Sequence, residues 1–305
     1  MYHDFFGLRE DPFRVTSDPR YLFPTPNSQE ALASLAYGIW KGYGIILMTG
    51  EAGTGKTTLL HALLDGLRGI GAATAFIFNT HVNVEGLLAC LMADFRIPGD
   101  FHTKGEALRR LHHWLLDRFR ADQKAVLIVD EAQNLSTDVL EEIRLLTNLE
   151  TPREKLLQIV LSGQPELEEK LKRPEVQQLR QRIAVRCRTT ALSSEETEGY
   201  ISKRLQVAGL NSRPIFSPEA ITSIYTYSQG IPRVINTLCE LALIHAFADQ
   251  MHSVAAAHVA EVAREFEIDS VEWAGSPTRC EVQGGTPVMP IKRCKPEVST
   301  SICRR

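Results

Sequence analysis

The stretch IILMTGEAGTGKTTLL, residues 45–60, decides the fold of this 305-residue chain. It opens with an apolar run of strand length, passes through a glycine-rich turn and ends in a pattern typical of a helix. The turn GEAGTGKT, residues 50–57, fits the spacing GxxxxGK[ST] and has the strand and helix that this spacing requires on either side. Backbone N–H groups of such a turn wrap phosphate groups. The stretch therefore predicts a P-loop, which binds a nucleoside triphosphate.

Two polar side chains of this turn have an expected task. Lys56 is expected to reach the β- and γ-phosphates of ATP, and the hydroxyl of Thr57 is expected to hold Mg²⁺. The residues expected to surround the nucleotide are Gly50, Glu51, Ala52, Gly53, Thr54, Gly55, Lys56, Thr57 and Thr58.

A second stretch, AVLIVDEAQ at residues 125–133, supplies two acidic side chains at the end of a buried strand. An acidic residue at the carboxyl end of such a strand lies beside the phosphate-binding loop. We expect Asp130 to hold Mg²⁺ and Glu131 to orient or activate the attacking water. The pair favours hydrolysis of ATP over transfer of its phosphoryl group to a small acceptor.

Five short apolar runs indicate strands, at residues 44–50, 74–79, 125–130, 156–163 and 183–189. Helical periodicity fills the stretches between them, as in 57–68 and 104–120. Runs that are apolar throughout, rather than alternating, indicate that both faces of the sheet are covered. The pattern predicts an α/β fold of the P-loop NTPase class, with a parallel sheet between two layers of helices.

The strand pattern ends near residue 191, and helix signals replace it. Ser193 and Glu196 form a capping box, and Ser217 is followed by Pro218 as a cap and a first-turn proline. Further helices are expected over 232–249 and 254–267. The predicted domains are a core over 1–190, including an N-terminal segment 1–30 that flanks the nucleotide, an all-helical lid over 191–268 and a disordered tail over 269–305.

The stretch YSQGIPRVIN, residues 227–236, places a cation where helix geometry disfavours it. Gly230 can end one helix in the left-handed conformation, and Pro232 suits the first turn of the next. Arg233 then lies in that first turn, where the helix dipole opposes a positive charge by about 0.3–1 kcal/mol. An anion beside Arg233 would explain its position.

Composition excludes several classes of protein. Hydrophobic residues make up 44% and charged residues 23%, and the net charge of −3 argues against binding a polyanion through bulk charge. The N-terminus lacks the pattern of a signal peptide, and no run approaches the length of a transmembrane helix. Six cysteines form no CxxC pair, which favours a reduced, cytoplasmic compartment.

Several blocks occur in an order that resembles one family. They are FFGLREDPF, DPRYLF, GEAGTGKTTL, VDEAQNLS, LLQIVLSGQPEL, LRQRI and GIPRVIN. Together they resemble AAA+ ATPases of the general secretion pathway protein A type, whose relatives include ATPases of mannose-sensitive pilus biogenesis and of exosortase polysaccharide loci. The resemblance covers residues 1 to about 265.

The resemblance implies roles for further residues. Asn79 matches the position that restrains the glutamate at the end of the third strand. Ser162 or Gln164 would sense the γ-phosphate, with Gln164 preferred because its amide both donates and accepts. Arg180 or Arg182, with Arg182 preferred, would be an arginine finger acting in trans within a homo-oligomer. Arg233 would contact the γ-phosphate from the lid.

The resemblance also implies a cytoplasmic ATPase that remodels a secretion, pilus or polysaccharide-export apparatus. The periphery of the inner membrane is the second location that the resemblance allows. Two alternatives stay open: a DNA-binding ATP switch resembling transposition ATPases, and a nucleotide-dependent scaffold. The N-terminal aromatic residues either cover the adenine or staple the two domains together, and the resemblance favours the first. They are Phe5, Phe6, Phe13, Tyr21 and Phe23.

Overall fold

The structure is a computed structural model that describes residues 2–78, 82–210 and 214–268. The chain divides into two compact units, residues 1–270 and 271–305, and every described residue lies in the first. Two predictions, the role of Asn79 and the disorder of 269–305, lie outside the described residues.

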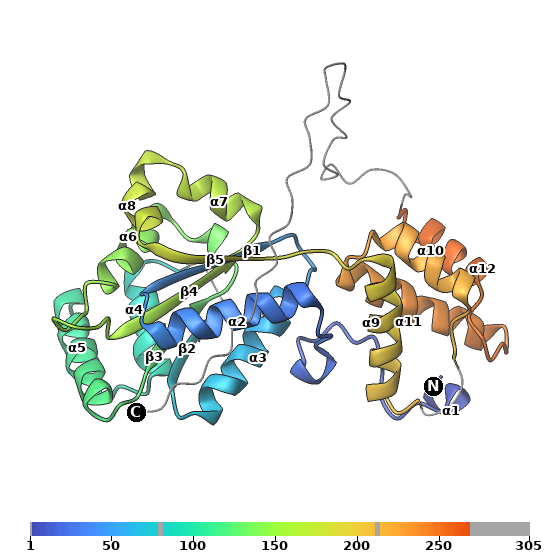
Figure 1. The fold of residues 1–305 in the computed structure, drawn as a ribbon, viewed down its shortest axis with the longest axis horizontal. Coiled ribbons are helices and arrows are strands. Elements are labelled where there is room, and N and C mark those ends of the chain that lie inside the picture. Colours follow the sequence, from blue (N-terminus) through green and yellow to red (C-terminus); the bar gives the residue numbers. More distant parts are fainter. Residues whose placement is uncertain (1, 79–81, 211–213, 269–305) are drawn as a thin grey trace, which may run out of the picture. The chain divides into compact units, whose positions relative to one another are not determined.

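The first part of the unit is built on a five-stranded parallel sheet with the strand order β2-β3-β4-β1-β5 (Figure 1). The strands are β1 (Ile45–Gly50), β2 (Ala73–Ile77), β3 (Ala125–Val129), β4 (Leu157–Gly163) and β5 (Ile183–Thr189). Four of them lie within the predicted runs, and β2 begins one residue before its run and ends two residues before the end of it. The parallel arrangement places the carboxyl ends of β1, β3 and β4 along one edge, where the predicted site residues follow.

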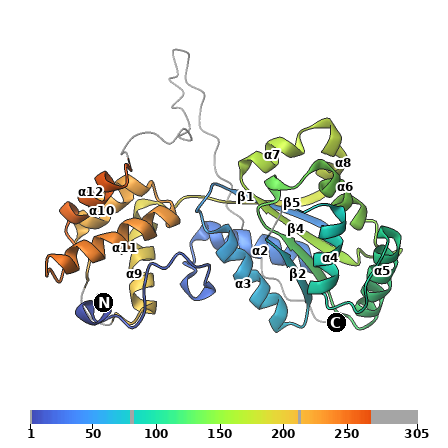
Figure 2. The same cartoon turned by 180° about the vertical axis from the view of Figure 1, so that it is seen from behind.

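Helices cover both faces of this sheet (Figures 1 and 2). They are α2 (Pro26–Lys41), α3 (Lys56–Gly69), α4 (Val84–Asp94), α5 (Lys104–Arg120), α6 (Thr137–Leu146), α7 (Pro165–Leu171) and α8 (Gln177–Gln181). Short 3-10 turns lie at η1 (Pro19–Tyr21), η2 (Ala132–Asn134) and η3 (Pro174–Val176). The three-layer fold predicted from the continuous apolar runs is confirmed.

Alternate residues of each strand enter different cores. In β1, Ile45 and Leu47 pack on one face with α4, α5 and α6. Ile46 and Met48 pack on the other face with α2 and α3. Because side chains alternate across a strand, a run that is apolar at every position needs a helical layer on each side. These two cores hold the carboxyl edge of the sheet in place.

The second part contains helices only. They are α9 (Ser194–Val207), α10 (Pro218–Ser228), α11 (Pro232–Ala248) and α12 (Ala256–Glu265). The capping box at α9 is present: Ser193 N donates to Glu196 Oε2 at 2.8 Å, and Glu196 N donates to Ser193 Oγ at 3.1 Å. Ser217 caps α10 as predicted. The last helix is shorter at both ends than the pattern over 254–267 indicated.

The N-terminal residues, which include α1 (His3–Phe6), pack with these helices. Tyr2, Phe6 and Phe13 are buried in one core with residues of α9 to α12. Phe13 meets Phe216 edge-on, with ring centroids 5.9 Å apart. By packing, residues 2–13 therefore belong to the helical part, whereas the predicted domains grouped residues 1–30 with the sheet.

The junction between α10 and α11 differs from the prediction in one residue. Gln229 adopts the left-handed conformation directly after α10, and Gly230 follows with φ 75°. A Cβ atom on Gly230 would lie 1.9 Å from the carbonyl oxygen of Leu192. Leu192 N also donates to Gly230 O at 2.8 Å. Gly230 is thus required for close backbone approach as well as for the turn, and it fixes the start of α11.

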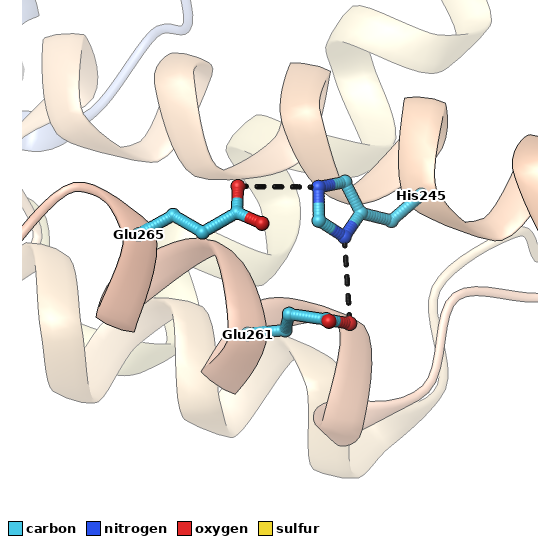
Figure 3. A group of neighbouring side chains, drawn as sticks. All are labelled: His245, Glu261 and Glu265. Atoms are coloured by element: carbon cyan, nitrogen blue, oxygen red, sulfur yellow. Dashed lines mark ion pairs between the residues drawn. The ribbon is translucent and has the colours of Figure 1, made fainter.

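Helices α11 and α12 are also joined by charged side chains, which Figure 3 shows. His245 lies between two carboxylates, with Nδ1 3.5 Å from Glu261 and Nε2 3.4 Å from Glu265. A single metal ion takes one ring nitrogen, whereas here each nitrogen faces a different carboxylate. The arrangement therefore fits a polar link between the two helices, and exposed pairs of this kind each contribute about 0–1 kcal/mol.

Candidate active site

The loop after β1 encloses a space that only glycine permits at two positions. A Cβ on Gly50 would lie 2.0 Å from Thr189 Oγ1, and a Cβ on Gly53 would lie 2.8 Å from Arg233 Cβ. Gly53 also has φ 80°, which L side chains rarely adopt. The backbone of the loop can therefore lie against both β5 and α11.

Lys56 begins α3 and is 5% exposed. Its Nζ donates to two loop carbonyls, Gly50 O at 2.7 Å and Glu51 O at 2.9 Å. Burial lowers the pKa of Lys56, although Glu131 and Asp130 act in the opposite direction. In the described part of the chain this ammonium forms no ion pair. A buried cation held only by neutral carbonyls suits a phosphate group as its partner.

Asp130 lies at the end of β3 and is 3% exposed. Its Oδ2 accepts from Thr57 Oγ1 at 2.7 Å, and its Oδ1 accepts from Ser162 Oγ at 2.8 Å. The structure thus brings together the two residues predicted to hold Mg²⁺. A carboxylate and a hydroxyl side by side are oxygen ligands of the kind that Mg²⁺ prefers, and their separation fits a shared or water-mediated ion. Ser162 contacts Asp130 rather than the loop.

Glu131 is the residue after Asp130, and its φ of 51° is an unusual backbone angle for a residue other than glycine. Its Oε2 accepts two amide hydrogen bonds, from Gln133 Nε2 at 2.6 Å and from Gln164 Nε2 at 3.4 Å. The contact with Gln164 places this predicted sensor beside the predicted base. Gln133 was not predicted as a site residue. Its position two residues after Glu131 in a tight turn was the available signal.

Arg233 lies in the first turn of α11, as predicted. Its backbone N donates to Gly53 O at 3.2 Å, so this turn touches the phosphate-binding loop directly. Its side chain is exposed and makes no hydrogen bond to the residues that the structure describes. Arg233 borders one cavity of about 170 Å³ together with Thr54, Lys56, Thr57, Glu131 and Asn236.

The two candidate arginine fingers lie away from this cavity. Arg182 donates from Nη1 to Arg144 O at 3.1 Å and to Asn148 Oδ1 at 2.7 Å, and it also contacts Thr147. These bonds satisfy the carboxyl end of α6. Arg180 is exposed at the end of α8, and no hydrogen bond joins it to the described residues. Among the described residues Arg180 is thus the less engaged of the two candidates, and the choice of finger stays a prediction.

The N-terminal segment forms a wall of the same cavity. Tyr21 and Phe23 line it, while Phe5, Phe6 and Phe13 pack with the helical part. Phe23 also packs against the helical core, and the predicted contact of these aromatic residues with adenine stays a prediction. The wall is thereby attached to the helices that carry Arg233.

A buried arginine makes this attachment. Arg204 of α9 is 4% exposed and donates to Pro12 O at 2.5 Å and to Arg14 O at 3.1 Å. It also donates to Tyr200 Oη at 2.7 Å, and Tyr200 in turn donates to Asn236 Oδ1 at 2.9 Å. The guanidinium lies 4.5 Å from the ring centroid of Tyr21. These bonds connect the N-terminal wall with the helix that begins at Pro232.

No helix among the described residues is long and apolar enough to cross a membrane.

Comparison with known proteins identifies a domain that contains the phosphate-binding loop. A model of the AAA domain family matches residues 40–171. General secretion pathway protein A of Aeromonas hydrophila is 43% identical over 280 residues, which cover 90% of this chain and 50% of that protein. The chain therefore spans about half the length of this curated relative.

Solved structures share the fold at low identity. Cdc6p from Pyrobaculum aerophilum has a TM-score of 0.68 at 16% identity, covering 85% of this chain and 71% of that one. ORC2 of Aeropyrum pernix, in ADPNP–ADP complexes, has a TM-score of 0.63 at 17% identity, covering 84% and 71%. At these identities the likeness concerns the fold alone.

The parallel sheet, the loop that holds Lys56 and the helical part that supplies Arg233 define an AAA+ P-loop NTPase. The match to the Aeromonas protein extends over nine-tenths of the chain, far beyond the loop itself. Residues 40–171 carry an AAA domain, and the chain is similar to general secretion pathway protein A over most of its own length.

Proposed function

We propose that this chain hydrolyses ATP to ADP and phosphate in the cavity bordered by Lys56, Glu131 and Arg233. The observation that carries the proposal is the placement of a buried, unpaired ammonium and a carboxylate at one cavity. The first supplies charge for phosphate oxygens, and the second can accept a proton from water. Catalysis of phosphoryl transfer consists mainly of such positioning and charge stabilisation.

The tasks of the individual residues follow from their contacts. Thr57 and Asp130 would hold Mg²⁺, which when bound neutralises charge on the phosphate oxygens. Lys56 would exchange its two carbonyl partners for phosphate oxygens. Glu131 would orient the water, and Gln164 beside it would report the γ-phosphate to the start of α7. The predicted restraint by Asn79 stays a prediction.

Phosphate release from ATP by the purified chain tests this function. We expect release that requires Mg²⁺ and stops when EDTA is added. A Lys56→Ala variant is the control for a contaminating ATPase, since it removes the ammonium and should abolish release. If wild-type and Lys56→Ala release phosphate equally, the proposed function is wrong.

Replacement of Arg233 by alanine tests the coupling between nucleotide and helical part. The variant should fold as stably as the wild type or slightly more so, because an unfavourable helix-dipole contact of about 0.3–1 kcal/mol is removed. Its affinity for ATP should fall about tenfold or more, since a hydrogen bond between charged groups contributes about 1.5–3 kcal/mol. Urea unfolding measures the stability, and equilibrium binding of a fluorescent ATP analogue measures the affinity. A fluorescence distance between dyes on α3 and α12 measures whether ATP moves the helical part.

Arg264→Ala, which removes an exposed arginine of α12, is the matched control. ATP should change the dye distance in the wild type and in Arg264→Ala but not in Arg233→Ala. An Arg233→Ala chain that is unfolded without nucleotide would show that Arg233 is structural and that the assignment to the γ-phosphate is mistaken.

The use of the released energy rests on the name of the Aeromonas relative. We propose that the chain acts as a homo-oligomer on an envelope apparatus for secretion, pilus assembly or polysaccharide export, from the cytoplasmic side and at the periphery of the inner membrane. Affinity capture with a Glu131→Gln variant in ATP would retain such a partner. The alternative of a DNA-binding ATP switch predicts instead that ATP retains the chain on DNA at moderate salt.

A further inference from the structure

The side chain of Gln133 bridges Glu131 and the junction of β4 with α7. Its Nε2 donates to Glu131 Oε2 at 2.6 Å, and its Oε1 accepts from Gln164 N at 3.1 Å. A backbone N–H can only donate, so the oxygen of the Gln133 amide must face Gln164. The NH₂ group then necessarily faces the carboxylate. The orientation of the Gln133 amide is therefore fixed by its hydrogen bonds, and its NH₂ group is the one that meets Glu131.

The surroundings of Gln133 are built to hold this amide. A Cβ on Gly163 would lie 2.7 Å from Gln133 Oε1, so any other residue at that position would push the amide away. Lys170 of α7 donates from Nζ to Gln133 O at 2.9 Å and also contacts Leu135 O. Both the backbone and the side chain of Gln133 are therefore tied to the segment 163–170.

The bonds to Glu131 leave its two oxygens in different situations. Oε2 accepts both amide donors, whereas Oε1 accepts no hydrogen bond from the part of the chain that the structure describes. Glu131 borders the cavity, and Gln133 does not. Among the described residues only Oε2 of this carboxylate is engaged, and the amide of Gln133 restricts where its other oxygen, Oε1, lies.

We propose that Gln133 is a positioning residue that fixes the carboxylate of Glu131 for activation of water. The proposal rests on the proposed hydrolysis of ATP. The amide acts as a donor to Oε2, with Gln164 as a second and longer contact. Because the amide of Gln133 also accepts from the backbone of Gln164, a shift of the start of α7 would be transmitted to the base.

Two substitutions separate the donor from the acceptor of this amide. Gln133→Met removes both and should lower kcat about 10-fold to 100-fold, the range expected for a lost hydrogen bond to a charged group. KM for ATP should not change, because Gln133 does not border the cavity. Gln133→Glu keeps an acceptor for Gln164 N but loses the donor and adds a negative charge beside Glu131. It should lower kcat at least as much as Gln133→Met.

Asn134→Met, in the same turn and exposed, is the matched control and should leave kcat and KM unchanged. If Gln133→Glu restores the kcat lost in Gln133→Met, the amide serves only to hold the turn and the proposal is overturned. A fall of kcat in Asn134→Met equal to that in Gln133→Met would overturn it as well.

A second measurement needs no nucleotide. In a double-mutant cycle of Gln133→Met and Glu131→Met, urea unfolding should show the two sites coupled by about tenfold in the unfolding constant. Absence of coupling, or coupling without a loss of kcat, overturns the role of Gln133. If the wild type releases phosphate and Gln133→Met has the same kcat, only the proposed role of Gln133 is refuted. Absence of phosphate release from the wild type refutes the proposed function itself.

Discussion

Replacement of Arg180 by alanine is expected to lower ATP turnover of the assembled protein about 10³-fold or more. An arginine that reaches the transferring phosphoryl group from a neighbouring subunit contributes about 10³–10⁵ to turnover in related reactions. Arg180 has the exposure this requires, since it lies at the end of α8 without a hydrogen bond to the described residues. ATP affinity of the isolated chain should be unchanged, because Arg180 does not border its own cavity.

Arg182→Ala is the matched comparison and should behave differently. Its guanidinium satisfies the carboxyl end of α6 through Arg144 O and Asn148 Oδ1. Its loss should cost about 1–3 kcal/mol of folding stability by leaving these groups unpaired. Urea unfolding of both variants distinguishes a missing finger from a weakened fold.

Mixing variants tests whether Arg180 acts in trans. Arg180→Ala subunits retain a complete nucleotide site, and Lys56→Ala subunits retain Arg180. Neither variant alone should release phosphate at the wild-type rate, whereas mixed oligomers should recover part of it. If mixing restores nothing while the two variants co-assemble, or if Arg180→Ala has wild-type turnover, Arg180 is not the finger.

Glu131→Gln is expected to lower kcat about 10²-fold to 10⁴-fold, the range for removal of a positioned general base. Glutamine has the same shape, and its carbonyl oxygen can still accept from Gln133 Nε2, so the turn 131–135 should keep its structure. ATP binding should survive because Lys56 and the loop are unchanged. Single-turnover phosphate release and equilibrium binding of a fluorescent ATP analogue measure the two properties.

Glu166→Gln is the control, since it makes the same chemical change at an exposed position of α7. It should have wild-type kcat. A Glu131→Gln chain that releases phosphate as fast as Glu166→Gln would show that another group activates the water.

The sequence predicts most of what lies on regular elements. Asp130 and Glu131 directly follow β3, and Lys56 and Thr57 begin the helix after the loop that follows β1. Both strands have clear apolar runs, and parallel strands bring their carboxyl ends together. The meeting of Thr57 with Asp130, 73 positions apart, is a consequence of this rule. Caps such as Ser193 are equally local, because their partners lie three residues away.

Contacts that depend on tertiary packing could not be predicted in the same way. Arg180 and Arg182 are two residues apart with similar surroundings in sequence, and only the position of α6 shows that Arg182 is engaged. Gln133 looks like an ordinary turn residue until β4 places Gly163 and Gln164 beside it. The N-terminal aromatic residues have no periodicity that indicates their partners, and those partners lie far along the chain, as Phe216 does from Phe13.

The packing of the N-terminal residues with the helical part has a consequence for biosynthesis. Tyr2 Oη donates to Glu240 Oε1 at 2.7 Å across 238 positions of the chain. At about 5–20 residues per second, the ribosome makes Glu240 roughly 10–50 s after Tyr2. During that time the sheet domain can fold, while Phe6 and Phe13 have no core to enter and are exposed to chaperones. A fusion partner or tag that occupies the N-terminus would be expected to impair this last step of folding more than the first.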